Sequence, residues 1–164
     1  MINRWEILLE KGQAYLELQK YEKASAALEK ALAEKPDYVP ILKLLADCHL
    51  QSGKQQEAKY TLEKIVKLSP TDYENTQKLG DLLLKEGKTE KGIMALTRAA
   101  SLRPNDKELQ YNLGLLNLHS GKEKEAEKCF QAAIRIDSSY SPAIIEMARL
   151  RINSGNIEVA IQMF

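Results

Sequence analysis

The sequence predicts an all-α fold in which a pair of antiparallel helices is repeated along the chain. The first observation is a set of glycines that recurs every 34 residues: Gly53, Gly87, Gly121 and Gly155. The second is a set of prolines with the same period: Pro36, Pro70 and Pro104. The third is the helical spacing of apolar residues in both halves of each period. Because two residue types keep one register, the chain contains an internal structural repeat.

Counting from Trp5 divides the chain into four complete repeats and a partial fifth: residues 5–38, 39–72, 73–106, 107–140 and 141–164. Residues 34 positions apart occupy the same place in successive repeats, and we call such a set a column. All eight glycines fall into three columns, so the periodic structure accounts for each of them. We expect residues 1–164 to form a single domain of repeats.

Each repeat contains two amphipathic helices. The second half of a repeat carries small or apolar residues at the i, i+3, i+4 and i+7 spacing of a helix face, as Ala24, Ala27, Leu28 and Ala31 illustrate. The first halves carry apolar residues at comparable spacing. We therefore expect helices near residues 5–18, 21–34, 39–52, 55–68, 73–86, 89–102, 107–120, 123–136, 141–154 and 157–164.

The residues between the helices are suited to end one helix and to begin the next. The periodic glycine fits the left-handed C′ position after the first helix. The periodic proline stops the second helix because it lacks an N–H group and clashes with the preceding turn. Asp72 and Asp106 are the expected N-caps of the helices that follow. A further column holds small residues that let a neighbouring helix approach closely: Gly12, Ala46, Gly80, Gly114 and Ala148.

Several columns together resemble the tetratricopeptide repeat, and the resemblance covers residues 5–164. Five residues of the first repeat match that pattern place for place: Gly12, Tyr15, Ala24, Ala31 and Pro36. The resemblance implies a right-handed α-solenoid whose concave wall is lined by the first helices and holds a peptide. Polar residues replace the usual apolar ones at four places: Lys11, Thr76, Gln110 and Asn117. We expect these departures to alter local packing without changing the fold.

The composition favours a folded protein without a strong electrostatic field. Hydrophobic residues make up 44% of the chain and charged residues 29%. The 24 lysines and arginines nearly balance the 23 aspartates and glutamates, so there is little attraction for nucleic acid. No apolar stretch approaches the roughly 18 to 20 residues that cross a bilayer, and residues 1–18 lack the features of a secretory signal. We expect a cytoplasmic protein that neither binds nucleic acid nor inserts into a membrane.

No residue pattern indicates catalysis, a metal or a cofactor. Asp47, Cys48 and His49 are the only cluster with catalytic residue types, but consecutive helical residues project about 100° apart and do not face one another. Cys48 and His49 fall in largely apolar columns, so both are expected in the core. Residues 87–89 resemble the end of a phosphate-binding loop, but the first glycine of that motif is missing. We predict that the chain is not an enzyme and uses no cofactor.

By the resemblance, partner-binding residues lie on the concave face, on the first helices of repeats two to five. The predicted peptide-binding set is Lys43, Asp47, Gln77, Asp81, Lys85, Tyr111, Leu115, Leu118, His119, Ile145 and Arg149. In repeats four and five, one aromatic and several aliphatic residues stand beside Arg149, a combination typical of binding hot spots. The alternative is that some of these residues pack on neighbouring helices.

One partner class known for the family does not fit this set. Lys43 occupies one of the lysine places with which family members grip chaperone C-terminal carboxylates. Asp47 and Asp81 stand where an amide is needed, and Glu108 stands at a basic place. A carboxylate ligand would therefore meet like charge, and we reject the chaperone-tail hypothesis.

The leading functional hypothesis is a scaffold or adaptor that binds a peptide or protein segment in the concave groove. Two alternatives stay open: the N-terminal repeat region of a larger enzyme such as a glycosyltransferase, and a self-assembling scaffold. The fifth repeat ends in a dense apolar segment: Ile157, Val159, Ile161, Met163 and Phe164. Exposed apolar residues of this kind favour a weak homo-oligomer formed through the C-terminal repeat.

Overall fold

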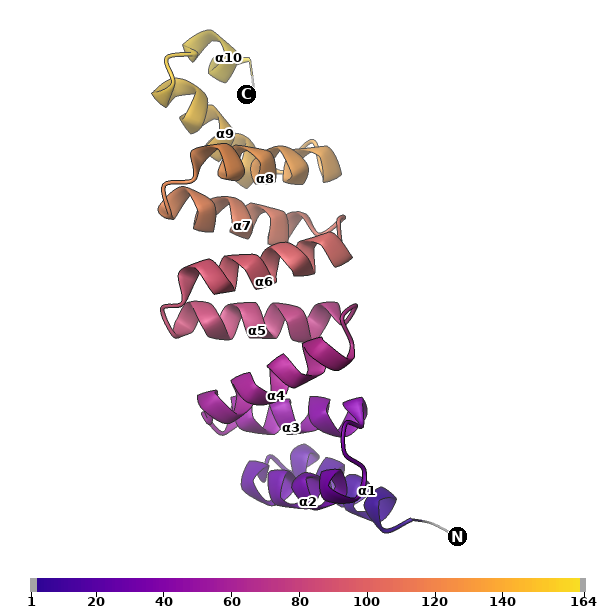
Figure 1. The fold of residues 1–164 in the computed structure, drawn as a ribbon. Helices are drawn as coiled ribbons and strands as arrows, with labels where there is room; N and C mark the ends of the chain where they lie inside the picture. The colour runs from indigo at the N-terminus through magenta and orange to yellow at the C-terminus, as the bar shows by residue number, and fades with distance from the viewer. Residues whose placement is uncertain (1–2, 163–164) are drawn as a thin grey trace. The chain divides into compact units, whose positions relative to one another are not determined.

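The computed structural model describes residues 3–162 and shows an all-helical chain. Within these residues it contains ten helices and no strand (Figure 1). In chain order they are α1 (Arg4–Glu17), α2 (Tyr21–Glu34), α3 (Val39–Gln51), α4 (Gln55–Leu68), α5 (Tyr73–Lys85), α6 (Thr89–Leu102), α7 (Lys107–His119), α8 (Glu123–Ile136), α9 (Ser141–Asn153) and α10 (Ile157–Ile161). The predicted order is confirmed, and the bounds of the first nine helices agree to within one residue.

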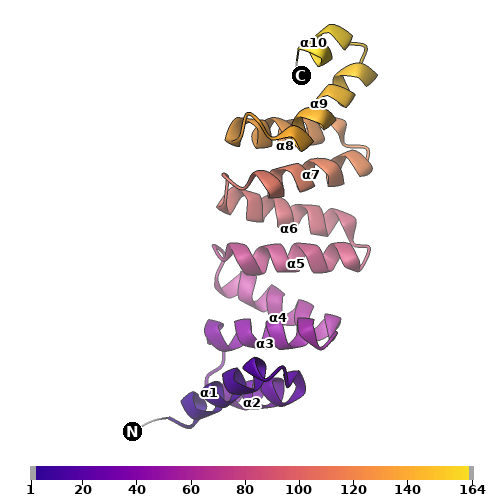
Figure 2. The same cartoon turned by 180° about the vertical axis from the view of Figure 1, so that it is seen from behind.

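The chain divides into two compact units, of which unit 1 ends at Lys88 and unit 2 begins at Thr89. In unit 1, α1 pairs with α2 and α3 with α4, while α2 packs on α3 and α4 packs on α5 (Figure 2). One core cluster joins α2 to α3: Ala24, Leu28, Ala31, Ile41, Leu45 and Cys48. The small side chains of this cluster let the helix axes come close, so that the larger ones can interlock.

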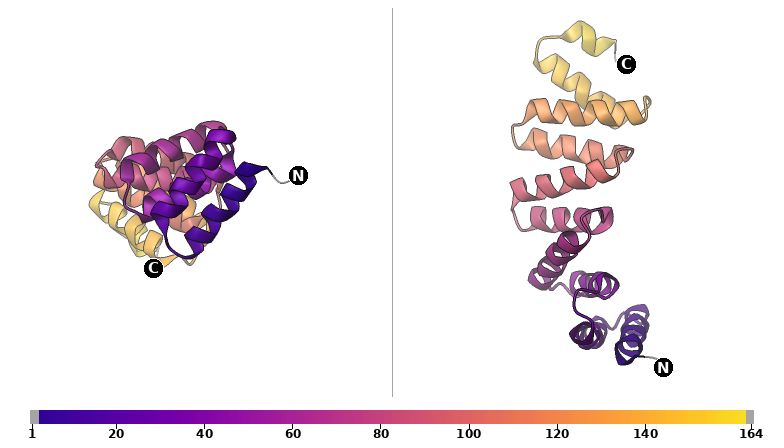
Figure 3. Two further views of the ribbon diagram at one scale, coloured as in Figure 1. Left: turned by 90° about the horizontal axis from the view of Figure 1, so that it is seen from below. Right: turned by 45° about the vertical axis from the view of Figure 1, so that its right-hand side comes forward.

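Unit 2 is built in the same way from α6 to α10. α6 packs on α7, α7 pairs with α8, α8 packs on α9, and α9 pairs with α10, as the right-hand view of Figure 3 shows. The core cluster joins α8 to α9: Ala126, Phe130, Ala133, Ala143 and Met147. The predicted second-helix columns are therefore the buried faces of α8, as they are of α2.

The first helices end one residue earlier than predicted, because the periodic glycine is the C′ residue and the residue before it is the C-cap. Gly53 has φ 74° and follows the C-cap Ser52. The backbone N–H of Lys54 donates to the carbonyl of His49 at 2.8 Å, which is the hydrogen bond of a Schellman motif. In repeat one this column holds Gln19, which also adopts a positive φ, of 54°.

Both predicted caps, and two of the four polar departures, form a local hydrogen bond. Asp72 and Asp106 cap α5 and α7 by accepting from backbone N–H groups at 3.1 Å and 2.9 Å respectively. Thr76 is 1% exposed, and its hydroxyl donates to the Asp72 carbonyl at 2.6 Å. Asn117 is 5% exposed, and its amide donates to the Leu113 carbonyl at 2.9 Å. Because their own helices satisfy them, these buried polar groups are accommodated without disrupting the stack.

The small column marks the places where the two helices of a repeat come closest. A methyl group on Gly12 would lie 2.7 Å from side-chain carbons of Leu28 on α2. One on Gly114 would collide with the ring of Phe130 on α8. The predicted close approach is therefore confirmed in repeats one and four, where each glycine makes room for a large buried side chain.

An ion pair connects the start of α7 to the end of α8. Lys107 Nζ donates to Asp137 Oδ2 at 2.6 Å, and the hydroxyl of Ser139 donates to Asp137 Oδ1 at 2.7 Å. Hydrogen bonds from Lys107 and then Ser139 lower the pKa of the Asp137 carboxyl to about 2. This folded-state pKa lies below the ordinary value of about 3.9. The ion pair therefore stabilises the fold fully at pH values above about 3.9. This contribution is lost as the pH falls toward 2.

We expect the Asp137 carboxyl to titrate near pH 2 in the folded protein, and Lys107→Met to raise its pKa toward the ordinary value of about 3.9. The reason is the loss of its strongest hydrogen-bond donor. Side-chain carboxyl NMR as a function of pH measures both values. Lys124→Met on the exposed side of α8 removes a charge elsewhere in unit 2 and serves as the control. An Asp137 pKa that Lys107→Met leaves unchanged would refute the role assigned to this ion pair.

Candidate protein-binding surfaces

The predicted residues of unit 1 lie on α3 and α5, and two of them are engaged in ion pairs. Lys43 Nζ lies 2.7 Å from Asp72 Oδ2, and Asp47 Oδ1 accepts from Lys78 Nζ at 2.8 Å. Desolvation acts to raise the pKa of Asp72, but hydrogen bonds from Lys43 and Asn75 outweigh it and the pKa is lowered. Lys43 and Asp47 thus have structural partners that any ligand must compete with.

The other predicted residues of unit 1 are more accessible. Gln77 is half-buried, whereas Asp81 and Lys85 are exposed one turn apart on α5. Desolvation raises the pKa of the Asp81 carboxyl, and Lys85 acts in the opposite direction. These three side chains present an amide, an acid and a base on one helix, a surface suited to polar contacts with a partner.

In unit 2 the predicted residues separate into a packed group and an exposed group. Tyr111, Leu115 and Leu118 on α7 are half-buried against the core cluster of α8 and α9. The Tyr111 ring centre lies 5.9 Å from that of Phe130 and 5.7 Å from that of Tyr140. These three residues therefore pack on neighbouring helices, which was the alternative to a binding role. They are core residues with part of their surface open.

The exposed group consists of His119 at the end of α7 and of Ile145 and Arg149 on α9. Ile145 is 39% exposed. Arg149 is also exposed, and its guanidinium donates to Glu146 Oε1 at 2.6 Å. Ile152, which is 51% exposed, lies on the same side of α9, since residues i, i+4 and i+7 share a helix face. We call Ile145, Arg149 and Ile152 the α9 stripe.

A hollow of about 430 Å³ lies between α1 and α3, on the side of the first helices. It is lined by Glu10, Gln13, Ala14, Leu16, Glu17 and Leu44. The predicted set omits repeat one, although Gln13 shares a column with Asp47 and Asp81. The same columns, followed back into the first repeat, lead to this hollow.

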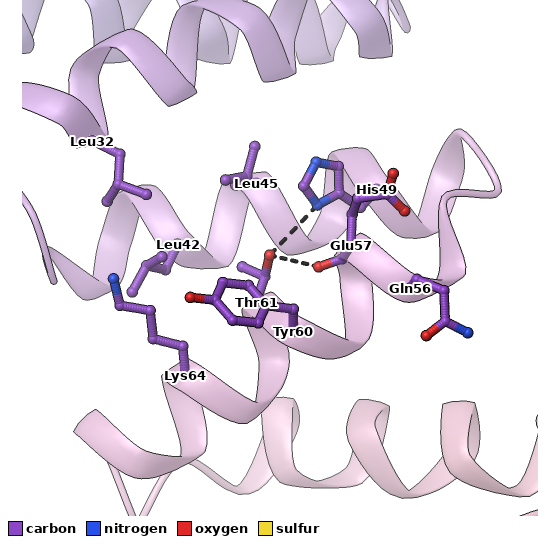
Figure 4. A pocket seen from close by; sticks show the side chains of 9 residues that line it. All are labelled: Leu32, Leu42, Leu45, His49, Gln56, Glu57, Tyr60, Thr61 and Lys64. Atoms are coloured by element: carbon purple, nitrogen blue, oxygen red, sulfur yellow. Dashed lines mark hydrogen bonds between the residues drawn. The ribbon is translucent and has the colours of Figure 1, made fainter.

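A second hollow, which was not predicted from the sequence, lies between α2, α3 and α4. This cleft has a volume of about 370 Å³ and is lined by Leu32, Leu42, Leu45, His49, Gln56, Glu57, Tyr60, Thr61 and Lys64 (Figure 4). It opens on the side of the second helices, where the repeat pattern indicates no binding residues. The one sequence signal for the cleft is the tyrosine at position 60, in a column that otherwise holds Ala26, Met94, Lys128 and Gln162. In the structure, Tyr60 is 71% exposed.

His49 forms the polar end of this cleft. Its Nδ1 lies 3.5 Å from Thr61 Oγ1, and the Thr61 hydroxyl donates to the Glu57 carbonyl at 2.8 Å. Its Nε2 lies 4.0 Å from Glu29 Oε1. Burial lowers the pKa of His49, while the charges of Glu29 and Glu57 act in the opposite direction. With the pKa below its ordinary value of about 6.5, the ring is neutral at pH 7.

Cys48 and His49 are buried, as expected from their columns in the sequence. Burial, with a smaller effect of Asp47, raises the pKa of the Cys48 thiol to about 11. The thiol is therefore protonated at neutral pH and is a poor nucleophile. Within residues 3–162, no three His, Cys, Asp or Glu side chains are placed to hold a metal ion, and no helix has the length and apolar character to cross a membrane.

Comparison with protein families identifies the repeat. Two tetratricopeptide repeat models match the chain, one over residues 15–80 and the other over residues 78–141. The chain is a tetratricopeptide repeat protein. Membership in this family supports a protein-interaction scaffold, a class that is generally not catalytic. A comparison with curated protein sequences finds no match.

Solved structures of tetratricopeptide repeat proteins share the fold. A crystal structure of MamA is 24% identical with a TM-score of 0.78, over 98% of this chain and 87% of that one. A MamA fragment from Desulfovibrio magneticus RS-1 is 18% identical with a TM-score of 0.75, over 100% and 93% of the two chains. A tetratricopeptide repeat protein from Parabacteroides merdae is 21% identical with a TM-score of 0.79, over 97% of this chain and 63% of that one. These similarities establish the helical repeat architecture.

Proposed function

We propose that this tetratricopeptide repeat protein is a non-catalytic scaffold that holds a peptide or protein segment against the first helices of its repeats. The observation that carries the proposal is the α9 stripe. It places two exposed isoleucines on either side of an exposed arginine, along one face of one helix. Apolar side chains exposed beside an arginine are typical of the central part of a protein interface.

Three partly buried residues on α7, the preceding first helix, also favour a binding role for this side of unit 2. Tyr111, Leu115 and Leu118 are held by the core cluster of unit 2, so a partner would meet their open surfaces in fixed positions. Fixed side chains lose little conformational entropy on binding. Among the described residues, the ion partner of Arg149 is Glu146 on its own helix, and the Arg149 side chain is 66% exposed whereas that of Glu146 is 13% exposed. The guanidinium has further N–H donors with which to bind a partner carboxylate while it keeps its hydrogen bond to Glu146.

We expect the double variant Ile145→Ser, Arg149→Glu to weaken partner binding by at least about thirtyfold, because even one hot-spot residue contributes roughly 2 kcal/mol. The partner is first isolated by affinity capture with the intact protein and identified by mass spectrometry. Isothermal titration calorimetry with the purified partner then compares the affinities. Both changes are at exposed residues, so the fold is retained. Tyr111→Ala is less informative, because the loss of its ring contacts destabilises unit 2.

The matched control is the double variant Met94→Ser, Lys128→Glu. It also removes one exposed apolar side chain and reverses one exposed charge, but on the second helices α6 and α8 of the same unit. We expect its affinity to equal that of the wild type. Equal affinities of the two double variants would show that the α9 stripe is not the binding surface.

A second candidate function, self-assembly, is favoured by the exposure of α10. Ile157, Val159 and Ile161 are 56%, 48% and 68% exposed. In the four preceding repeats the columns of Ile157 and Val159 hold mainly polar residues, so this helix is apolar on sides that are usually solvated. The other predicted contact residues, 163 and 164, lie outside the described residues. A helix that is apolar on most sides is usually covered, and we propose a second copy of the chain as its cover.

We expect the protein to associate weakly and reversibly with rising concentration, and Ile161→Glu to abolish this association. Burial of one isoleucine gains roughly 1.5–3 kcal/mol, so a few such side chains from each copy support a weak dimer. Sedimentation equilibrium at several concentrations measures the mass. Gln162→Glu adds the same charge at the adjacent exposed residue and is the control. A strictly monomeric wild type, or an oligomer that Ile161→Glu leaves intact, would refute self-assembly through repeat five.

A further inference from the structure

We propose that the cleft between α2, α3 and α4 is a separate binding site on the opposite side of the repeats, and that it takes an arginine side chain of a partner polypeptide. Its volume of about 370 Å³ is at the lower end of the range of roughly 300–1,000 Å³ for ligand pockets. That size suits one long side chain. Its apolar floor and acidic rim match the two parts of an arginine, the methylene stem and the guanidinium group.

The floor of the cleft is apolar. Leu42 and Leu45 on α3 are 2% and 5% exposed, and Leu32 on α2 completes the wall (Figure 4). Such a floor covers the methylene stem of a long side chain whose charged end remains at the rim. An aspartate or glutamate side chain is too short to use this floor and would bring the wrong charge to the rim.

Tyr60 on α4 provides an aromatic surface at the mouth of the cleft. Its side chain is 71% exposed, so the face of the ring is open to a ligand. A guanidinium group stacks well on an aromatic face, and arginine does so more often than lysine. The exposed ring therefore favours arginine over other long side chains.

Two carboxylates lie near His49, one in the lining of the cleft and one on α2. Glu57 on α4 lines the cleft, and Glu29 on α2 lies 4.0 Å from His49 Nε2. Across the described residues, neither glutamate forms an ion pair with a lysine or arginine. Unpaired carboxylates beside an apolar floor are the complement of a guanidinium, whose planar group of donors can bind more than one acceptor.

The cations near the cleft do not cancel this acidic rim. Lys64 lies at the end of the cleft away from His49 and Glu57 (Figure 4), and its Nζ is held 2.7 Å from Asp37 Oδ1. Lys54, which acts on His49 electrostatically, is exposed in the turn before α4, where water screens its charge. The end of the cleft that holds His49 therefore remains acidic.

His49 adds a neutral acceptor to this end of the cleft. Its side chain is buried, and the Thr61 hydroxyl already donates its proton to the Glu57 carbonyl. Thr61 can then only accept from His49, which assigns the imidazole proton to Nδ1 and leaves a lone pair on Nε2. That nitrogen faces Glu29 rather than Thr61. A guanidinium N–H can donate to it, and a neutral ring does not repel the cation.

This combination of residues occurs in one repeat. The column of His49 holds Tyr15, Leu83, Asn117 and Arg151, and that of Glu57 holds Lys23, Lys91, Glu125 and Val159. The column of Tyr60 holds an alanine, a methionine, a lysine and a glutamine in the other repeats. The periodic fold does not require a histidine, a glutamate and a tyrosine at these places. Their convergence on one cleft is the reason to assign it a ligand.

The test uses the full chain and the blocked tripeptide acetyl-Ala-Arg-Ala-amide as the probe. Titration followed by ¹H–¹⁵N NMR should shift the amide resonances around His49, Tyr60 and Thr61. The same tripeptide with citrulline, which has the shape of arginine without its charge, should bind about tenfold more weakly because charge-assisted hydrogen bonds are lost. Glu57→Gln should weaken binding of the arginine probe by a similar factor, and Tyr60→Ala should also weaken it.

Glu125→Gln is the matched control, because Glu125 occupies the column of Glu57 in repeat four and is exposed in the same way. Its affinity for the probe should equal that of the wild type. Both test residues are exposed, and circular dichroism confirms that each variant is folded. Equal binding of the arginine and citrulline probes would overturn the proposal. So would shifts that map to α7 and α9, or an affinity that neither Glu57→Gln nor Tyr60→Ala changes.

Discussion

Replacement of Phe130 by alanine is expected to lower the free energy of unfolding of unit 2 by about 3–5 kcal/mol. Phe130 is fully buried and belongs to the core cluster that joins α8 to α9. Its ring also lies 5.9 Å from that of Tyr111 on α7. One side chain thus holds three helices together, and its removal loses both the buried apolar area and an aromatic pair.

The cavity left by this substitution cannot collapse easily. Gly114 faces the Phe130 ring and has no side chain to move into the space. The other members of the core cluster include Ala126, Ala133 and Ala143, whose methyl side chains are also too short to fill the space. Because the cost of a core truncation rises with the volume that remains empty, we place this effect toward the upper part of its range.

Chemical denaturation followed by circular dichroism gives the loss of stability, and hydrogen exchange by mass spectrometry locates it. Faster exchange should appear first in α7, α8 and α9. Phe130→Leu retains most of the apolar volume and should lose clearly less. A loss for Phe130→Ala below about 1 kcal/mol, the typical effect of an ordinary substitution, would show that the ring is not the centre of this core.

The sequence predicted the fold well because each repeat carries local signals for its own helix ends. Gly53 and its column supply a residue that accepts positive φ, and Asp72 and Asp106 supply caps that act within one turn. The one-residue error at the ends of the first helices arises because the C-cap residue before the glycine still donates a hydrogen bond to the carbonyl four residues earlier, while its ψ near 0° is no longer helical, as Ser52 shows.

The binding surfaces were harder to predict, because exposure depends on contacts between repeats that a column does not reveal. Ile145 and Tyr111 share a column, yet Tyr111 packs on Phe130 and Tyr140 while Ile145 remains exposed. The sequence predicted that Lys43 binds a partner, but in the structure it forms an ion pair with Asp72 at the end of its own repeat. The cleft that includes Tyr60 was missed because it depends on residues that differ between repeats, whereas a periodic pattern reveals only those that recur.

The second large effect is expected for Leu62→Ala, which should lower the free energy of unfolding by about 2–5 kcal/mol. Leu62 is fully buried on α4, the helix that packs on both α3 and α5. Because repeats contact mainly their neighbours, a solenoid loses stability first around the damaged repeat. Hydrogen exchange should therefore accelerate in α3, α4 and α5 at denaturant concentrations that leave α8 and α9 protected.

The control for this prediction is Lys67→Ala, which truncates an exposed side chain on the same helix. It should change stability by no more than about 0.5 kcal/mol, as is usual for surface positions. Comparison with Phe130→Ala makes the test sharper, because the two core variants should produce opposite patterns of early exchange. If exchange rose uniformly along the chain in both variants, the described helices would unfold as one cooperative unit. The nearest-neighbour description of this protein would then be wrong, and a partner bound at one end would be able to stabilise the other.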